Sequence, residues 1–367
     1  MDVLVLTVVH DPEDTRIRHK QIAALRDAGH AVTYAAPFSA YGRALPDDLE
    51  AVDLPRARGR RRLKAFRASR QLMRQRAQEF DIILMHDPEL VLAAKKVRHP
   101  GLVWDVHEDT AAAVRIKPWL PRVARTLAVR LIRRIERLAE RRMTLLLAED
   151  GYTVRFQGSH PVIRNGAVEP TEIDAETDNR VVYLGRITNA RGAAEMIELG
   201  KRLTPEIEIH LIGHADPDCD DDVMAAHRAG HIHWHGYVPN DQALTHLSGA
   251  LAGLSLLHNQ PNYAYSRPTK VLEYMAYGLP VVTTPNPASV ELVDGHGCGI
   301  VVPFGDVDAA EAALRGINDD RTRRDQMADA GRKAVNEYYS WNADADLFLR
   351  TLQGVAEHNL HTRFPGP

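Results

Sequence analysis

Short apolar runs alternate with amphipathic segments along the first half of the chain. Between the first two runs, Ile17, Ile22, Leu25 and Ala28 recur with helical spacing until Gly29 ends the pattern. Short continuous hydrophobic strands that alternate with helices are typical of a parallel sheet covered on both faces. We therefore predict an α/β domain with a doubly wound sheet. Its expected strands lie at 3–9, 30–36, 81–85, 101–106 and 143–148.

The same pattern starts again after residue 180, with apolar runs at 182–185, 207–213, 231–236, 251–257, 279–284 and 299–302. The polar stretch 164–180 between the two series holds the turn signal Asn165-Gly166 and is interpreted as a linker. A chain of 367 residues also exceeds what one core usually fills. We predict an N-terminal domain at 1–167, a C-terminal domain at 168–340, and a helix at 341–367 that packs back on the first domain.

Three of the apolar runs in the first half end in a histidine beside carboxylates. The sequence HDPE occurs at 10–13 and again at 86–89, and VHED occupies 106–109. Ligands bind at the carboxyl ends of strands in parallel sheets, so we expect the three segments to meet at one edge. The alternative is ordinary turn chemistry, because Asp-Pro and His-Asp are common in loops. Recurrence at three equivalent positions favours a functional site.

Charge is unevenly distributed between the two halves. Residues 1–170 carry 30 Lys and Arg against 21 Asp and Glu, a net charge of +9, whereas the remaining 197 residues have a net charge of −12. The excess lies mainly in 56–76 and 115–142, which indicates an anionic partner such as a membrane surface. Trp119 and Leu120, between cations, could form an interfacial tip; a solvated Arg-rich face is the alternative. No base-reading motif accompanies the charge, so nucleic acid is not expected.

In the second basic segment an apolar stripe recurs at helical spacing. We expect this stripe to pack against the core, with the arginines outside. Its members are Val123, Leu127, Leu131, Ile135 and Leu138.

Other features limit the cellular setting. No run of eighteen apolar residues occurs, the N-terminus lacks a basic leader region, and the chain has only two cysteines. We expect a cytoplasmic protein, with peripheral binding to the inner face of the plasma membrane as a further expectation.

Two segments of the second half resemble the nucleotide-binding domain of retaining group 1 GT-B glycosyltransferases (family 4). VVYLGRITNARGAAEMIELGKRL (181–203) is similar to its first strand and helix, and SRPTKVLEYMAYGLPVVTT (266–284) to its donor-binding helix. VIRNGAVEP (162–170) resembles the linker. HDPEDTRIRHKQIAALRDAGHAV (10–32) and VWDVHED (103–109) resemble a bacterial subset that builds surface polysaccharides. The resemblance spans about residues 2–357.

This resemblance implies two Rossmann-like domains that face each other across a cleft, where ligands commonly bind. It also implies transfer of a hexose, with retention, from a UDP- or GDP-sugar to a lipid-linked or polysaccharide acceptor. Two alternatives remain open: the same transfer onto a soluble small molecule, and nucleotide-sugar 2-epimerisation, which would yield product from the donor alone.

The family's donor site maps onto identifiable residues. Arg186 and Arg191 would hold the diphosphate, whose negative charge grows as the glycosidic bond breaks. Pro268 suits a first helical turn, after which free N–H groups would bind an anion. Glu273 would accept hydrogen bonds from the ribose diol, and Lys270 would contact phosphate or sugar. Exposed loop arginines and a surface glutamate are the alternatives. The implied donor-binding set is Gly185, Arg186, Arg191, Gly236, Tyr237, Thr269, Lys270, Val271 and Glu273.

His107 matches the family's histidine beside the transferred sugar, so the implied catalytic set is His107, Arg186 and Arg191. His10, Asp14 and His86 are the candidates on the acceptor side. We favour front-face substitution in which the departing phosphate accepts the acceptor's proton. Tyr265 stands where relatives often have a glutamate, which leaves the sugar open.

No metal or other cofactor is expected. His231, His233 and His235 share one strand face, and residues 216–222 (DPDCDDD) mimic a metal-binding Asp-x-Asp. We interpret the first as an exposed strand face and the second as a solvated loop.

Overall fold

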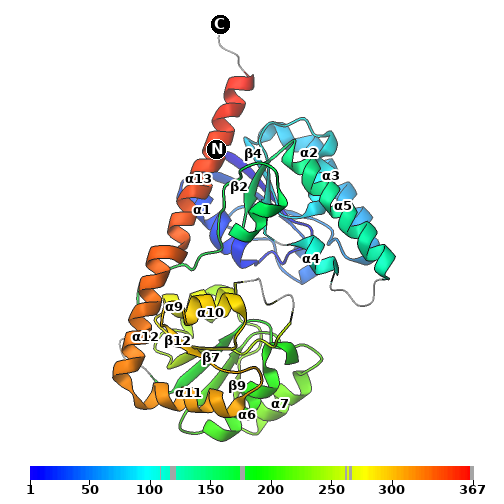
Figure 1. Ribbon diagram of the computed structural model, residues 1–367. Coiled ribbons are helices and arrows are strands. Elements are labelled where there is room, and N and C mark those ends of the chain that lie inside the picture. Colours follow the sequence, from blue (N-terminus) through cyan, green and yellow to red (C-terminus); the bar gives the residue numbers. More distant parts are fainter. Residues whose placement is uncertain (108, 116–120, 174–177, 261–262, 264–266, 364–367) are drawn as a thin grey trace. The chain divides into compact units, whose positions relative to one another are not determined.

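A computed structural model describes residues 1–107, 109–115, 121–173, 178–260, 263 and 267–363 (Figure 1). The chain folds into two compact units. Met1–Asn165 and Asn342–Pro367 form the first unit, and Gly166–Trp341 the second. Among the described residues, no helix is long and apolar enough to cross a membrane.

The first unit contains a six-stranded, wholly parallel sheet in the order β3-β2-β1-β4-β5-β6. Each of the five expected apolar runs forms a strand. The additional strand β3 was missed because it lies at the sheet edge, with two acidic residues at its ends and only partly buried residues between them. The strands are β1 Asp2–Leu6, β2 Ala31–Ala36, β3 Glu50–Asp53, β4 Ile82–Met85, β5 Leu102–Val106 and β6 Thr144–Leu147.

Helices cover both faces of this sheet, with α2, α3 and α5 on one side and α1 and α13 on the other (Figure 1). The segment after β1 begins as a π-helix at Thr15–Ile22, where the Asp14 carboxylate accepts hydrogen bonds from the Arg16 and Ile17 backbone N–H groups. The α-helices are α1 Ala23–Asp27, α2 Arg62–Arg76, α3 Pro88–Ala93, α4 Thr110–Arg115, α5 Arg122–Glu140 and α13 Trp341–Arg363.

The expected packing of the stripe on α5 is wrong for most of its length. Val123, Leu127 and Leu131 are 72%, 58% and 55% exposed, and only the C-terminal part of the helix, with Ile135 and Ala139, reaches the core. Periodicity identified one face of a helix correctly, but it could not tell whether other elements cover that face.

The second unit has a parallel sheet in the order β12-β11-β10-β7-β8-β9. All six expected runs form strands, although β9 is only two residues long. The strands are β7 Arg180–Leu184, β8 Glu208–Ile212, β9 His233–Trp234, β10 Ala252–Ser255, β11 Val281–Thr283 and β12 Gly299–Val301. The α-helices are α6 Ala193–Leu203, α7 Asp220–Arg228, α8 Asn240–Thr245, α9 Thr269–Ala276, α10 Pro287–Val293, α11 Val307–Asp319 and α12 Arg321–Ala334.

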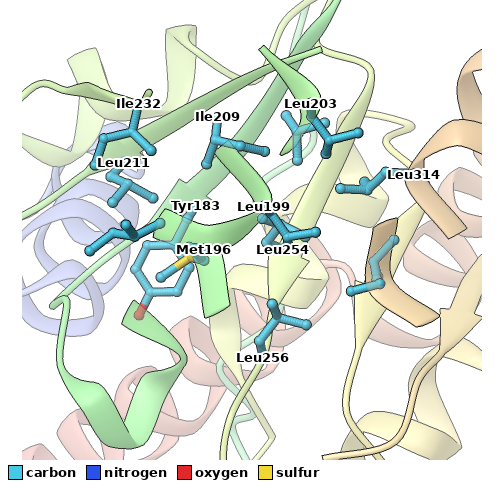
Figure 2. Packing of buried hydrophobic residues seen from close by; sticks show 14 of the residues in the cluster. Tyr183, Met196, Leu199, Leu203, Ile209, Leu211, Ile232, Leu254, Leu256 and Leu314 are labelled. Carbon is cyan, nitrogen blue, oxygen red and sulfur yellow. The ribbon is translucent and has the colours of Figure 1, made fainter. Parts of the chain in front are cut away.

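Hydrophobic clusters pack against the two faces of this second sheet. One contains Tyr183, Met196, Leu199, Ile209 and Leu211, which pack closely together (Figure 2). In each sheet the fourth strand along the chain lies beside the first, on the side opposite the second strand. The order in which strands are added to the sheet therefore changes direction between the first and fourth strands. The carboxyl ends of the strands beside this switch point are where doubly wound sheets bind ligands.

Candidate active site

The three histidine–acid segments of the first unit come together as the sequence predicted. His10 follows β1, His86 and Asp87 follow β4, and His107 follows β5. The Nε2 atoms of His10 and His107 lie 3.1 Å apart, and His10 Nε2 lies 3.3 Å from Asp87 Oδ1. The ring centroids of His86 and His107 are 5.6 Å apart. We call His10, His86, Asp87, Asp105 and His107 the histidine–carboxylate cluster.

Asp105, the penultimate residue of β5, is the buried anion of this cluster. Its two oxygens accept hydrogen bonds of 2.7 Å from Nε and Nη2 of Arg16, and Nη2 also donates to the carbonyl of Ile163. Burial alone would raise the pKa of Asp105, but the Arg16 guanidinium and the two neighbouring imidazoles hold that pKa well below its usual range. Asp105 is therefore ionised. Arg16 was not predicted from the sequence, because its helical position did not distinguish it from a surface arginine.

The carboxylates determine which ring nitrogens carry protons. Nδ1 of both His86 and His107 faces Asp105 Oδ2, at 3.3 and 3.4 Å. An ionised carboxylate accepts hydrogen bonds only, so it favours the Nδ1–H tautomer of His107. That tautomer leaves His107 Nε2 as an acceptor for the Nε2–H of His10. Burial lowers the pKa of His86, which favours its neutral form.

Asp87 orients the other end of the cluster. It accepts hydrogen bonds from the Thr7 hydroxyl at 3.0 Å and from the Val8 backbone N–H at 2.5 Å. Although burial opposes it, the contacts with His10 and Val8 hold the pKa of Asp87 below its usual range. Asp14 lies further away, with Oδ2 3.8 Å from His10 Nδ1.

A second candidate site lies in the second unit, around the buried side chain of Lys270. This residue is in the first turn of α9, and its Nζ lies 3.4 Å from the centre of the Tyr183 ring. Burial, followed by repulsion from Arg191, holds the pKa of Lys270 well below its usual range. Within the described part of the chain, the buried Nζ has no hydrogen-bond partner. A buried amine without an acceptor is costly and indicates a place for an anion.

The loop after β7 contributes Arg191 to the surroundings of Lys270. Arg191 contacts the Tyr183 hydroxyl and lies over the Tyr263 ring at 6.0 Å. Gly185 has a φ of +106°, and a Cβ there would lie 3.7 Å from Lys270 Nζ. Arg186, in contrast, points to the acidic loop, and its Nε lies 2.5 Å from Asp216 Oδ1. Asp216, in the loop interpreted as solvated, therefore pairs with a predicted donor-site arginine.

The start of α9 differs in detail from the prediction. Pro268 is the residue before the helix, and the Val271 N–H donates to the Pro268 carbonyl at 2.9 Å, so it is not free for an anion. Thr269 opens the helix, and Glu273 follows one turn later with its side chain half-buried.

The remaining donor-site candidates follow β9. Gly236 accepts a hydrogen bond from the Gly213 N–H at 2.8 Å, and Tyr237 is half-exposed. These two residues therefore also lie at the carboxyl edge of the sheet, next to the loop that follows β8.

Comparison with known proteins agrees with this architecture. Residues 169–334 match the family model described as "Glycosyl transferases group 1". This match spans nearly all of the second unit. The chain is 25% identical to phosphatidyl-myo-inositol mannosyltransferase from Mycolicibacterium smegmatis over 374 residues, which cover 93% of this chain and 90% of that protein.

Solved glycosyltransferase structures confirm that this chain has the expected GT-B fold. HepE from Anabaena in complex with UDP and glucose has a TM-score of 0.68 at 15% identity, covering 96% of this chain and all of that chain. Sucrose-phosphate synthase from Thermosynechococcus elongatus has a TM-score of 0.69 at 15% identity, covering 96% and 98%. Three residues singled out in the sequence, Trp119, Leu120 and Tyr265, lie outside the described residues.

Proposed function

We propose that the protein transfers a hexose from a UDP- or GDP-sugar to a lipid-linked or polysaccharide acceptor, with retention and without a catalytic metal. The observation that carries this proposal is the buried amino group of Lys270, which lacks a hydrogen-bond partner among the described residues. A diphosphate would supply that partner. The complex of HepE with UDP and glucose supports a nucleotide-sugar donor for a chain of the same fold.

The proposed chemistry uses fixed cations in place of a metal. As the bond between the sugar and the diphosphate breaks, Lys270, Arg191 and Arg186 would stabilise the negative charge that grows on the phosphate oxygens. The acceptor hydroxyl would form the new bond on the same face of the sugar, and its proton would pass to the departing phosphate. Arg186 has to exchange Asp216 for phosphate in this step, because the two side chains are paired in the structure.

We assign the histidine–carboxylate cluster to the sugar and the acceptor. In the favoured tautomer, His107 Nε2 is a hydrogen-bond acceptor, and a hydroxyl of the hexose would replace the Nε2–H of His10 as its donor. His10, Asp14 and His86 would face the acceptor. A metal ion fits this cluster poorly, because both oxygens of Asp105 are already held by Arg16.

The exposed stripe on α5 supports an acceptor at an anionic membrane surface. Val123, Leu127 and Leu131 lie at i, i+4 and i+8, and six arginines occupy other positions of the same helix. An apolar face flanked by cations is the pattern of an interfacial helix. The name of the mycobacterial relative, a phosphatidyl-myo-inositol mannosyltransferase, also supports a lipid acceptor.

A two-step experiment tests the proposal. Thermal-shift screening of UDP, GDP and their sugars identifies the donor, because a ligand at a hundred times its dissociation constant stabilises by about 2.7 kcal/mol. The selected donor is then incubated with extracted membrane lipids, with and without EDTA, and the anomeric configuration of the product is determined by NMR. We expect lipid-dependent transfer with retention that survives EDTA. Product from the donor alone would favour the epimerase, and transfer only to a soluble acceptor would refute the lipid assignment.

A further inference from the structure

A second group of histidines lies on strands β8 and β9 of the second unit. Glu208 and His210 alternate along β8, so their side chains share one face, while Ile209 and Leu211 pack into the core on the other. The sheet register pairs His210 with His233 on the edge strand β9. Glu208 and His233 are the first residues of their strands, whereas the donor-site loops follow the carboxyl ends.

We propose that Glu208, His210 and His233 form a binding site for a divalent transition-metal ion, with Zn²⁺ as the best-fitting ion. Glu208 Oε2 lies 3.2 Å from His210 Nε2 and 3.7 Å from His233 Nε2. All three ligand atoms lie within 4.8 Å of one another. Two ligands of a tetrahedral zinc ion are separated by about 3.3–3.4 Å when each bond is about 2.0–2.1 Å long. Only small side-chain movements would therefore close the site.

Imidazole nitrogen with one carboxylate oxygen is a donor set that zinc prefers over magnesium or calcium. Three protein ligands leave the fourth position of the tetrahedron to water. The sheet backbone fixes the spacing of the three side chains, because β8 and β9 are paired at His210 and His233.

Neighbouring imidazoles provide the outer contacts that metal-binding histidines require. His210 Nδ1 lies 3.1 Å from His235 Nε2, and the two rings are stacked with centroids 5.2 Å apart. When His210 Nε2 binds the ion, its Nδ1–H donates to His235, which fixes the tautomer and the ring orientation. The ring of His246 lies next to that of His235, with centroids 4.6 Å apart. Neutral His210 carries one ring proton. When Nε2 binds the ion, this proton moves to Nδ1, so the ring releases no proton to the solvent.

The site would hold the edge of the sheet together. β9 contains only two residues, and the chain then enters the loop with Gly236 and Tyr237. An ion bridging β8 to His233 would fix β9 without contacting the reacting groups. Removal of the ion should therefore lower thermal stability while leaving metal-independent transfer intact.

Calorimetric titration of tag-free, chelator-treated protein with ZnCl₂ tests the site directly. We expect one equivalent to bind, and Glu208→Gln and His233→Gln each to weaken binding at least tenfold. These two side chains are 35% and 48% exposed, so both variants should fold. The matched control is His231→Gln, a histidine just before β9 that is not among the three ligands, and its affinity should equal that of the wild type.

Two outcomes of the titration would overturn the proposal. Absence of saturable binding would mean that these side chains form only a polar strand face. Zinc binding that survives both ligand variants but is lost in His107→Gln would place the ion in the histidine–carboxylate cluster instead. Circular dichroism of each variant establishes that the loss of binding is not a loss of folding.

Discussion

Replacing Lys270 by methionine should stabilise the free protein and weaken donor binding at the same time. Methionine keeps an unbranched apolar stem and removes the ammonium. In the folded protein, burial and Arg191 hold the pKa of Lys270 well below its usual range, whereas the unfolded chain keeps this amine protonated up to about pH 10. The group therefore lowers the free energy of unfolding at pH 7, and this penalty disappears as the pH rises toward 10.

The size of the stability change follows from the difference in the pKa of Lys270 between the folded and unfolded chain. Each pKa unit of depression costs about 1.4 kcal/mol at neutral pH, and one kcal/mol changes the melting temperature of a domain of this size by roughly 2–4 °C. Conversely, a hydrogen bond to a charged group contributes about 1.5–3 kcal/mol. Loss of that bond should raise the dissociation constant for the nucleoside diphosphate by roughly ten- to a hundredfold.

Differential scanning calorimetry measures the change in melting temperature, and isothermal titration with UDP or GDP measures the change in the dissociation constant. Titration in two buffers with different ionisation enthalpies adds a third readout, because the wild type should take up a proton when the diphosphate binds and Lys270→Met should not. Lys201→Met is the control: this lysine is exposed on α6, 3.3 Å from Glu198, and its loss should change neither quantity appreciably. A Lys270→Met variant that melts lower than the wild type at pH 7 and keeps full nucleotide affinity would refute the reasoning.

Three further predictions concern other residues. Glu273→Ala should weaken nucleotide binding about ten- to a hundredfold, and Arg186→Ala should in addition lower kcat; unchanged affinity in both variants, measured by titration, would remove them from the donor site. Asp344 is buried in the first turn of α13, and burial raises its pKa to about 6, so its ionisation destabilises the folded state increasingly between pH 4 and 6 and fully above pH 6. Asp344→Asn should therefore raise the unfolding free energy at pH 7.5 by up to about 3 kcal/mol in denaturant titrations, and the gain should vanish near pH 4; a gain independent of pH would contradict this cause. Replacing Val123 and Leu127 together by serine should reduce flotation with anionic vesicles most clearly at high salt, where the apolar contribution dominates; equal flotation of variant and wild type would exclude α5 as the contact.

The sequence determined the strands and the sheet edge at which the histidine–acid segments lie. Continuous apolar runs identify buried parallel strands because both faces of such a sheet are covered, and all eleven expected runs form strands. Parallel strands also bring their carboxyl ends to one edge. For that reason the segments that contain His10, His86 and His107 could be predicted to meet from their positions along the chain alone.

Tertiary structure decided which of those residues are paired, buried or exposed. Arg16 and Asp105 are 89 residues apart in the chain, and nothing in their local sequence distinguishes that ion pair from two surface charges. Lys270 looks like any helical lysine until Tyr183 and the loop after β7 enclose it. Similarly, Val123 and Leu127 carry the periodicity of a core face and lie in solvent, and Glu208 meets His233 only through the register of β8 and β9. Periodicity reports the conformation of one segment, whereas burial and pairing depend on segments far apart in the chain.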